Sequence, residues 1–118
     1  MKTNKTLIMV GEKVLIRPDE DAEQSAAGLY LPPTVREKER VQGGYVVKTG
    51  PGYPIADPSA SEEPWMERKF KYIPLEATEG DYAIFLRSEA IEIEFEDEKY
   101  LIVPHSAILA LVRTELLD

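Results

Sequence analysis

Residues 91–103 read IEIEFEDEKYLIV and carry the clearest structural signal in the chain. From Ile91 to Phe95, apolar and acidic residues alternate, which is the two-residue period of a strand with one buried face. Tyr100–Val103 is a second β-rich run, separated from the first by the charged residues 96–99. The two runs therefore predict a β-hairpin.

Shorter runs of the same kind lie on both sides of this hairpin. Each is bounded by Gly, Pro or charged residues, and they are Lys13–Arg17, Tyr45–Lys48, Tyr82–Leu86 and Ile108–Val112. The last run also permits a short helix, because Ala107, Leu109 and Leu111 are good helix formers. Several short strands separated by turn residues predict an all-β protein, either a small barrel or a sandwich.

Composition limits the possible partners and chemistry. The 118 residues suit one domain spanning residues 1–118, and the net charge is −8. This charge argues against nucleic acid and anionic membranes as partners, because both attract Lys and Arg. The chain has no cysteine, which excludes disulfides, thiolate nucleophiles and zinc sites that contain Cys.

The apolar runs are too short for a membrane span or a signal peptide. The longest is Ala107–Val112, whereas a span needs roughly 18 apolar residues. Near the start, only Leu7–Val10 are apolar, and a signal peptide needs about 7–15 such residues. We therefore expect a cytoplasmic protein.

Two segments fit no strand pattern, residues 19–42 and residues 53–75. Irregular segments of roughly 20 residues are uncommon in a compact domain and usually have a function. The first segment is polar and charged except for the apolar triplet Leu29-Tyr30-Leu31, which follows Gly28 and precedes two prolines. From the residues alone, the triplet is either another strand of the core or a linear motif that docks in a partner's groove.

Five stretches together resemble the GroES-type co-chaperonin family. In chain order they are VGEKVLIRPDE (10–20), AGLYLPPTVREKE (27–39), GGYVVKTGPG (43–52), EGDYAIF (79–85) and IEIEFEDEKYLIVPHSAILALV (91–112). Each stretch alone has low specificity, but their order and spacing together have high specificity. The resemblance implies an irregular β-barrel with a mobile loop at residues 19–42 and a roof loop at residues 53–75.

The resemblance also implies an assembly and a partner. The assembly is a ring of seven subunits, in which segments near Leu7–Val10 and Leu109–Val112 pair between neighbours. The partner is an ATP-bound chaperonin ring, whose groove receives the partner-binding residues Gly28, Leu29, Tyr30 and Leu31. The resemblance implies no cofactor, because the chaperonin and not this chain binds the ATP.

Three features depart from the family pattern. Tyr30 stands where a small aliphatic residue is usual, so its hydroxyl needs a partner or an open pocket edge. The turn at residues 96–98 lacks the Gly often found there, which predicts a longer or looser hairpin. The segment 53–75 is longer than the usual roof, and its roof-loop candidates are Trp65, Phe70 and Tyr72. This segment is either an enlarged roof that narrows the opening of the dome or a loop packed on its own barrel.

Two other classes of function compete with a co-chaperonin. An enzyme is disfavoured, because His105 and Ser106 are adjacent and adjacent strand residues point to opposite faces. We expect His105 to be a turn or partly exposed residue instead. The run Thr49–Gly52 is Gly-rich, but it matches neither the phosphate loop nor the dinucleotide fingerprint. The second class is a stand-alone β-barrel module that presents the triplet to a partner other than a chaperonin. A heptamer favours the co-chaperonin, and a stable monomer favours the module.

Overall fold

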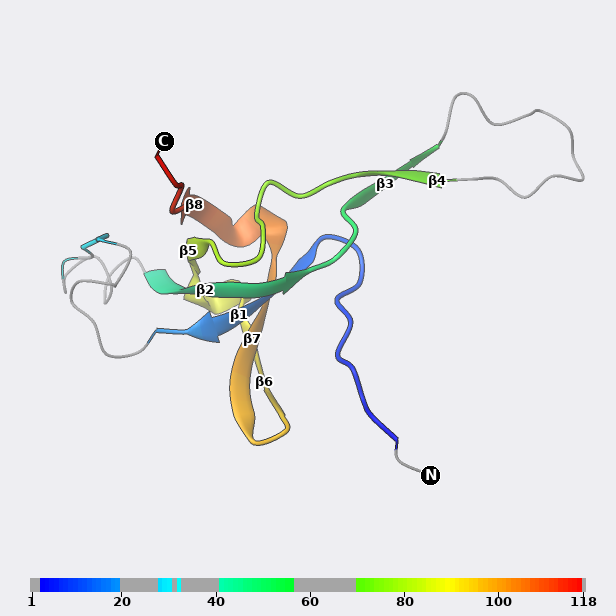
Figure 1. The fold of residues 1–118 in the computed structure, drawn as a ribbon, viewed down its shortest axis with the longest axis horizontal. Helices are drawn as coiled ribbons and strands as arrows, with labels where there is room; N and C mark the ends of the chain where they lie inside the picture. Colours follow the sequence, from blue (N-terminus) through cyan, green and yellow to red (C-terminus); the bar gives the residue numbers. More distant parts are fainter. Residues whose placement is uncertain (1–2, 20–27, 31, 33–40, 57–69, 118) are drawn as a thin grey trace, which may run out of the picture.

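The computed structural model describes residues 3–19, 28–30, 32, 41–56 and 70–117. Within these ranges the regular structure consists of β-strands and two short 3-10 turns (Figure 1). The strands are β1 (Lys13–Pro18), β2 (Val41–Thr49), β3 (Tyr53–Ala56), β4 (Phe70–Ile73), β5 (Tyr82–Leu86), β6 (Ile91–Phe95), β7 (Glu98–Pro104) and β8 (Ile108–Val112). The 3-10 turns are η1 (Arg87–Glu89) and η2 (His105–Ala107). The predicted all-β class is confirmed.

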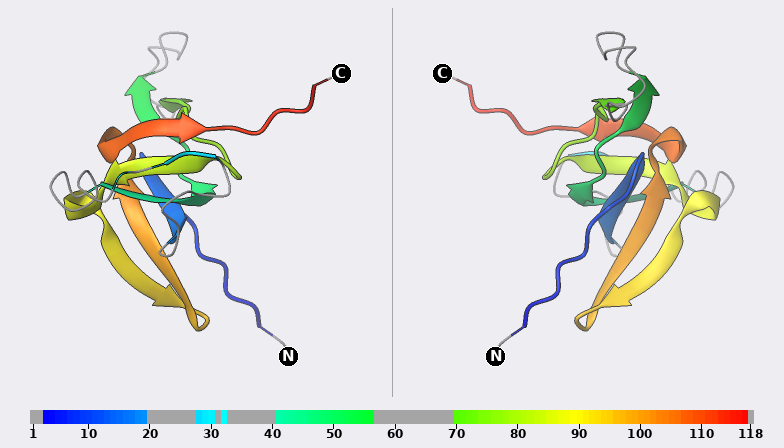
Figure 2. Two further views of the ribbon diagram at one scale, coloured as in Figure 1. Left: turned by 90° about the vertical axis from the view of Figure 1, so that its left-hand side faces the viewer. Right: turned by 90° about the vertical axis from the view of Figure 1, so that its right-hand side faces the viewer.

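Six of the strands form one antiparallel sheet in the order β6-β7-β1-β2-β5-β8. Figure 2 shows that this sheet is strongly twisted, with the β6–β7 hairpin and β8 at different sides of it. The described pairings leave β6 and β8 as the two outer strands, so closure of the sheet into a barrel stays a prediction. The run at Ile108–Val112 forms a strand that pairs with β5, and the helical alternative for it is wrong.

The strand β5 is buried on both of its faces, and this divides the core into two clusters. Ala83 and Phe85 point into the main cluster, whereas Tyr82 and Ile84 belong to a second one. The buried members of the main cluster are Val14, Ile16, Val46, Leu75, Ala77, Ala83, Phe85, Leu101, Val103 and Ala107. The second cluster is built on Val41, Tyr82 and Ile84, and we call these three residues the platform.

The strand β2 begins earlier than its sequence pattern predicts. Gly43 and Gly44 were expected to bound a strand starting at Tyr45, but both lie inside β2, which starts at Val41. They are glycines because neighbouring side chains occupy the space of a Cβ atom. A Cβ at Gly43 would lie 2.1 Å from the Tyr82 hydroxyl, and one at Gly44 would lie 2.4 Å from Ile16 Cγ2. The predicted irregular segment 19–42 therefore ends before Val41.

The β6–β7 hairpin is tight, so the expectation of a longer or looser turn is wrong. Phe95 pairs with Glu98, which leaves Glu96 and Asp97 as a two-residue turn. Their φ angles are 51° and 63°, the left-handed values of the turn type that matches strand twist. Gly or Asn usually takes these positions, but acidic residues occupy both of them here.

Part of the predicted irregular segment 53–75 forms a hairpin, in which β3 pairs with β4. Figure 1 shows this hairpin projecting away from the six-stranded sheet. Its base is held by close backbone contacts: Gly52 N–H donates to the Gly11 carbonyl at 3.0 Å. A Cβ at Gly52 would lie 1.9 Å from the Ile73 carbonyl oxygen, and the φ of Gly52 is +116°. The base of the second excursion is thus held against the turn that precedes β1, in a backbone conformation that favours glycine at position 52.

An ion pair fixes the chain where it leaves β8. Arg113 donates from Nε and Nη2 to the two carboxylate oxygens of Asp81, at 2.8 Å each, and from Nη2 to the Glu76 carbonyl at 2.9 Å. Asp81 is only 2% exposed and also accepts hydrogen bonds from the backbone N–H and the hydroxyl of Thr78. The Arg113 guanidinium, followed by the Thr78 donors, lowers the pKa of Asp81 despite its burial.

Asp81→Asn is expected to lower the free energy of unfolding by about 2 kcal/mol at neutral pH, because hydrogen bonds to a charged group are lost. The folded-state pKa of Asp81 lies below its ordinary value of 3.8. Its contribution is therefore fully present above pH 3.8 and is lost as the pH falls through the lower folded-state value. Thermal unfolding of both proteins across pH 2.5–7 measures this, and a stability difference that does not shrink toward low pH contradicts it.

Candidate functional site

The described part of the apolar triplet lies against the sheet but is not a strand of the core. Gly28 has a φ of +85°, a left-handed value that favours glycine just before the apolar residues. Leu29 is half-buried and packs against the platform. Tyr30 is 55% exposed and takes part in a single β-bridge, whereas Leu31 lies outside the described residues. The described residues therefore present one apolar side chain to the sheet and one to solvent.

The platform also holds the chain where the first excursion leaves β1. The Tyr82 hydroxyl donates to Asp19 Oδ2 at 3.1 Å, and the Asp19 N–H donates to the Gly43 carbonyl at 3.0 Å. Tyr82 itself is 4% exposed. Its ring packs edge-on against the ring of Tyr45, and the two ring centroids are 5.0 Å apart. Sequence reasoning did not identify Tyr82 as part of this site, because only the tertiary fold brings it beside residues 19 and 29.

The roof-loop candidates are only partly within the described chain. Trp65 lies outside the described residues, and Phe70 lies in β4 with its side chain outside them. Tyr72 is 50% exposed on β4. Sequence reasoning missed Tyr53 and Ile55 on β3, which are 39% and 41% exposed. The hairpin thus presents apolar side chains on both of its strands.

The segments expected to pair between subunits expose apolar side chains. Ile8 and Val10 are 73% and 76% exposed, and the segment around them forms no strand within the described chain. Leu109 on β8 is 57% exposed, and β8 is an outer strand of the sheet. An outer strand offers unpaired backbone groups to another chain.

The histidine is a partly exposed turn residue, as the sequence predicts. His105 and Ser106 lie in the 3-10 turn η2, not on a strand, so the opposite-faces argument does not apply to them. His105 Nδ1 instead lies 3.4 Å from the hydroxyl of Tyr53 on the projecting hairpin. Ser106 is exposed. The histidine therefore contacts the base of the hairpin.

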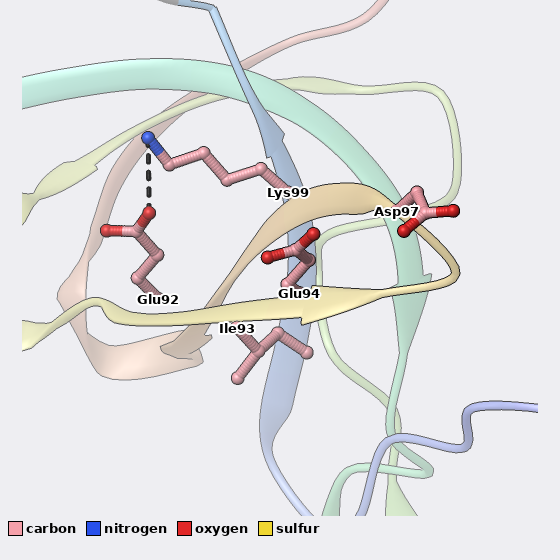
Figure 3. A pocket seen from close by; sticks show the side chains of 5 residues that line it. All are labelled: Glu92, Ile93, Glu94, Asp97 and Lys99. Carbon is pink, nitrogen blue, oxygen red and sulfur yellow. Dashed lines mark ion pairs between the residues drawn. The ribbon is translucent and has the colours of Figure 1, made fainter.

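Carboxylates gather on the β6–β7 hairpin around an open depression of about 440 Å³, lined by Glu92, Ile93, Glu94, Asp97 and Lys99. Figure 3 shows Glu92 paired with Lys99, their charged atoms 3.1 Å apart, while Asp97 lies away from this pair near the turn. The acidic side chains are all exposed, which is the usual solvated face of an edge hairpin. Among the described residues, no three acidic or His side chains are placed to hold a metal ion.

In the part of the chain that the structure describes, no helix has the length and apolarity needed to cross a membrane.

Comparison with known proteins finds a family match over most of the chain. The model of the family described as "Chaperonin 10 Kd subunit" matches residues 6–112. Proteins named Co-chaperonin GroES from Mycolicibacterium vanbaalenii, Nocardia farcinica and Mycobacterium tuberculosis are each 36% identical over 101 residues. Each alignment covers 86% of this chain and 88% of the relative. The chain therefore belongs to the chaperonin 10 kDa subunit family, the GroES-type co-chaperonins, which is not a family of enzymes.

Proposed function

We propose that this protein is a ring-shaped cap for a GroEL-type chaperonin and encloses a folding protein beneath it. The observation that carries the proposal is the family match together with the apolar residues of the first excursion. Gly28, Leu29, Tyr30 and Leu31 form the contact with the chaperonin, and we call the side chains of Leu29, Tyr30 and Leu31 the hook. The protein acts in the cytoplasm and needs no cofactor of its own, because the chaperonin binds the ATP.

The hook is weak by itself, and this weakness suits a reversible cap. Burying each large apolar side chain contributes about 1.5–3 kcal/mol, and ordering the surrounding chain removes about 2–5 kcal/mol of the gross interaction. A single hook therefore holds poorly, whereas several hooks linked in one ring bind together with a much higher avidity. A change in the groove caused by the nucleotide state then releases all hooks at once.

The ring consists of seven copies that pair through their terminal segments. The exposed side chains of Ile8, Val10 and Leu109 and the outer position of β8 support this pairing. The β3–β4 hairpin of each copy points toward the roof, and its exposed Tyr72 and Ile73 supply contacts there.

Association with a purified GroEL-type chaperonin, measured with and without ATP, tests the proposed function. We expect a complex that forms with ATP, and a free protein that sediments as a heptamer. A stable monomer that does not associate in either state would favour the stand-alone binding module and would overturn the proposal.

A further inference from the structure

The contact between Leu29 and the platform lies within one subunit, yet it involves a residue of the hook. Leu29 is half-buried against Val41, Tyr82 and Ile84, all of which belong to the sheet. A side chain packed there cannot at the same time be buried in the groove of another protein. The intramolecular contact and the contact with the chaperonin are therefore mutually exclusive for Leu29.

We propose that the platform is a docking site for the chain's own Leu29, and that it holds this residue back from the chaperonin in the free cap. This inference rests on the proposed function. A ligand that binds only one of two conformations has its apparent affinity reduced by the fraction of molecules in that conformation. The platform therefore lowers the affinity of the cap for the chaperonin and shields an apolar side chain until the groove is present.

The surroundings of the platform fit a contact that opens and closes. Gly28, directly before Leu29, has a left-handed φ and no atom within 4 Å of the position of a Cβ, so the chain has the conformational freedom of an uncrowded glycine at this point. At the start of the excursion, where the chain leaves β1, the backbone is fixed because Asp19 is hydrogen-bonded to Tyr82 and to Gly43. Tyr30 is already exposed, so release of the platform contact changes mainly the position of Leu29.

The platform is also connected to the outer strand of the sheet. Val112, near the end of β8, packs against the same cluster as Leu29 and pairs with Tyr82. The docking site thus lies beside the edge through which neighbouring subunits are proposed to pair.

The test uses Val41→Ala, which removes two methyl groups from the platform and leaves the hook intact. Val46→Ala is the matched control, because Val46 lies on the same strand and is also buried but belongs to the main cluster. We expect Val41→Ala to bind a purified GroEL-type chaperonin with ATP about three- to tenfold more tightly than wild type. Val46→Ala should bind like wild type. Equal affinities for all three proteins would overturn the docking site.

A second measurement keeps the inference testable if Val41→Ala does not fold. Leu29→Ala in the free protein should shift the methyl NMR signals of Val41 and Ile84 and leave those of Val46 unchanged. Unchanged signals at all three positions would overturn the docking site. If Leu29→Ala shifts the platform signals but the wild-type protein does not associate with the chaperonin in the presence of ATP, the proposed function fails and the docking site stands.

Discussion

Leu29→Asp is expected to abolish ATP-dependent capture of the cap by its chaperonin. The substitution replaces an apolar side chain by a charge that cannot be buried in an apolar groove without a large desolvation cost. Every subunit of the ring carries the same change, so the binding free energy of every hook is reduced. We therefore expect the affinity of the cap to fall by more than about a hundredfold. Co-sedimentation of cap and chaperonin with ATP measures this loss, and Leu31→Ala should give the same result.

The fold should survive this substitution. Leu29 is only half-buried, and the platform behind it is formed by residues of the strands β2 and β5. Ile91→Asp is the matched control, because Ile91 is an aliphatic residue that is 63% exposed on β6, a strand that contributes no residue to the platform. It places the same new charge on the ring and should leave capture intact. Normal capture by Leu29→Asp would remove Leu29 from the hook.

Rings that mix wild-type and Leu29→Asp subunits separate avidity from the strength of one contact. If simultaneous hooks hold the cap, capture should fall steeply once a few of the copies carry aspartate. A loss that is simply proportional to the fraction of aspartate subunits would contradict the multivalent mechanism.

The sequence predicted those strands whose signal is contained within the strand itself. In β6, the alternation of Ile91, Glu92 and Ile93 predicts the strand correctly, although its apolar face is only half-buried at Ile93 and exposed at Ile91. The strand β5 is an uninterrupted apolar run because it is buried on both faces, and such runs are also visible without tertiary information. The same local signal predicted β1 and β7, whereas the run that forms β8 also permitted a short helix.

The errors arise where a distant residue decides the local structure. Gly43 and Gly44 have the composition of a turn, and only the fold shows that Tyr82 and Ile16 fill the space above them. The composition of the turn at Glu96 and Asp97 also misleads, because strand pairing imposes two consecutive left-handed residues although neither of them is a glycine. The geometry of a strongly paired sheet therefore overrides both local preferences.

In the candidate site, too, one part can be predicted from the sequence and the other part depends on the tertiary fold. The triplet around Leu29 stands out in the sequence because its flanks are charged or proline-rich. The packing of Leu29 on Val41, Tyr82 and Ile84 depends on three residues that are 12 or more positions away, and no periodicity reports it. The sequence thus identifies the hook, whereas the structure shows what the hook contacts in the free chain.

Gly44→Ala is expected to be the most destabilising conservative substitution in the sheet. Its Cβ atom would lie 2.4 Å from Ile16 Cγ2 and 2.7 Å from the Arg17 carbonyl oxygen, so the backbone of β1 has to move. The strand β2 lies between β1 and β5 and cannot move away from one neighbour without approaching the other. Overpacking of this kind costs about 1–3 kcal/mol, and the backbone contact places Gly44→Ala at the upper end, about 3 kcal/mol.

A loss of stability in Gly44→Ala would indicate steric conflict, whereas a gain would indicate that the backbone preference of alanine dominates. Gly44 does not have a left-handed φ, so alanine suits its backbone and would by itself stabilise the fold by about 0.4–1 kcal/mol through the unfolded chain. Gly80→Ala is the opposite control, because Gly80 has open space around it but a φ of +95°. Urea unfolding at one subunit concentration should show a clearly larger loss for Gly44→Ala than for Gly80→Ala. A gain in stability for Gly44→Ala would mean that Ile16 and the backbone of β1 move at little energetic cost. Gly44 would then not determine the spacing between β1 and β2.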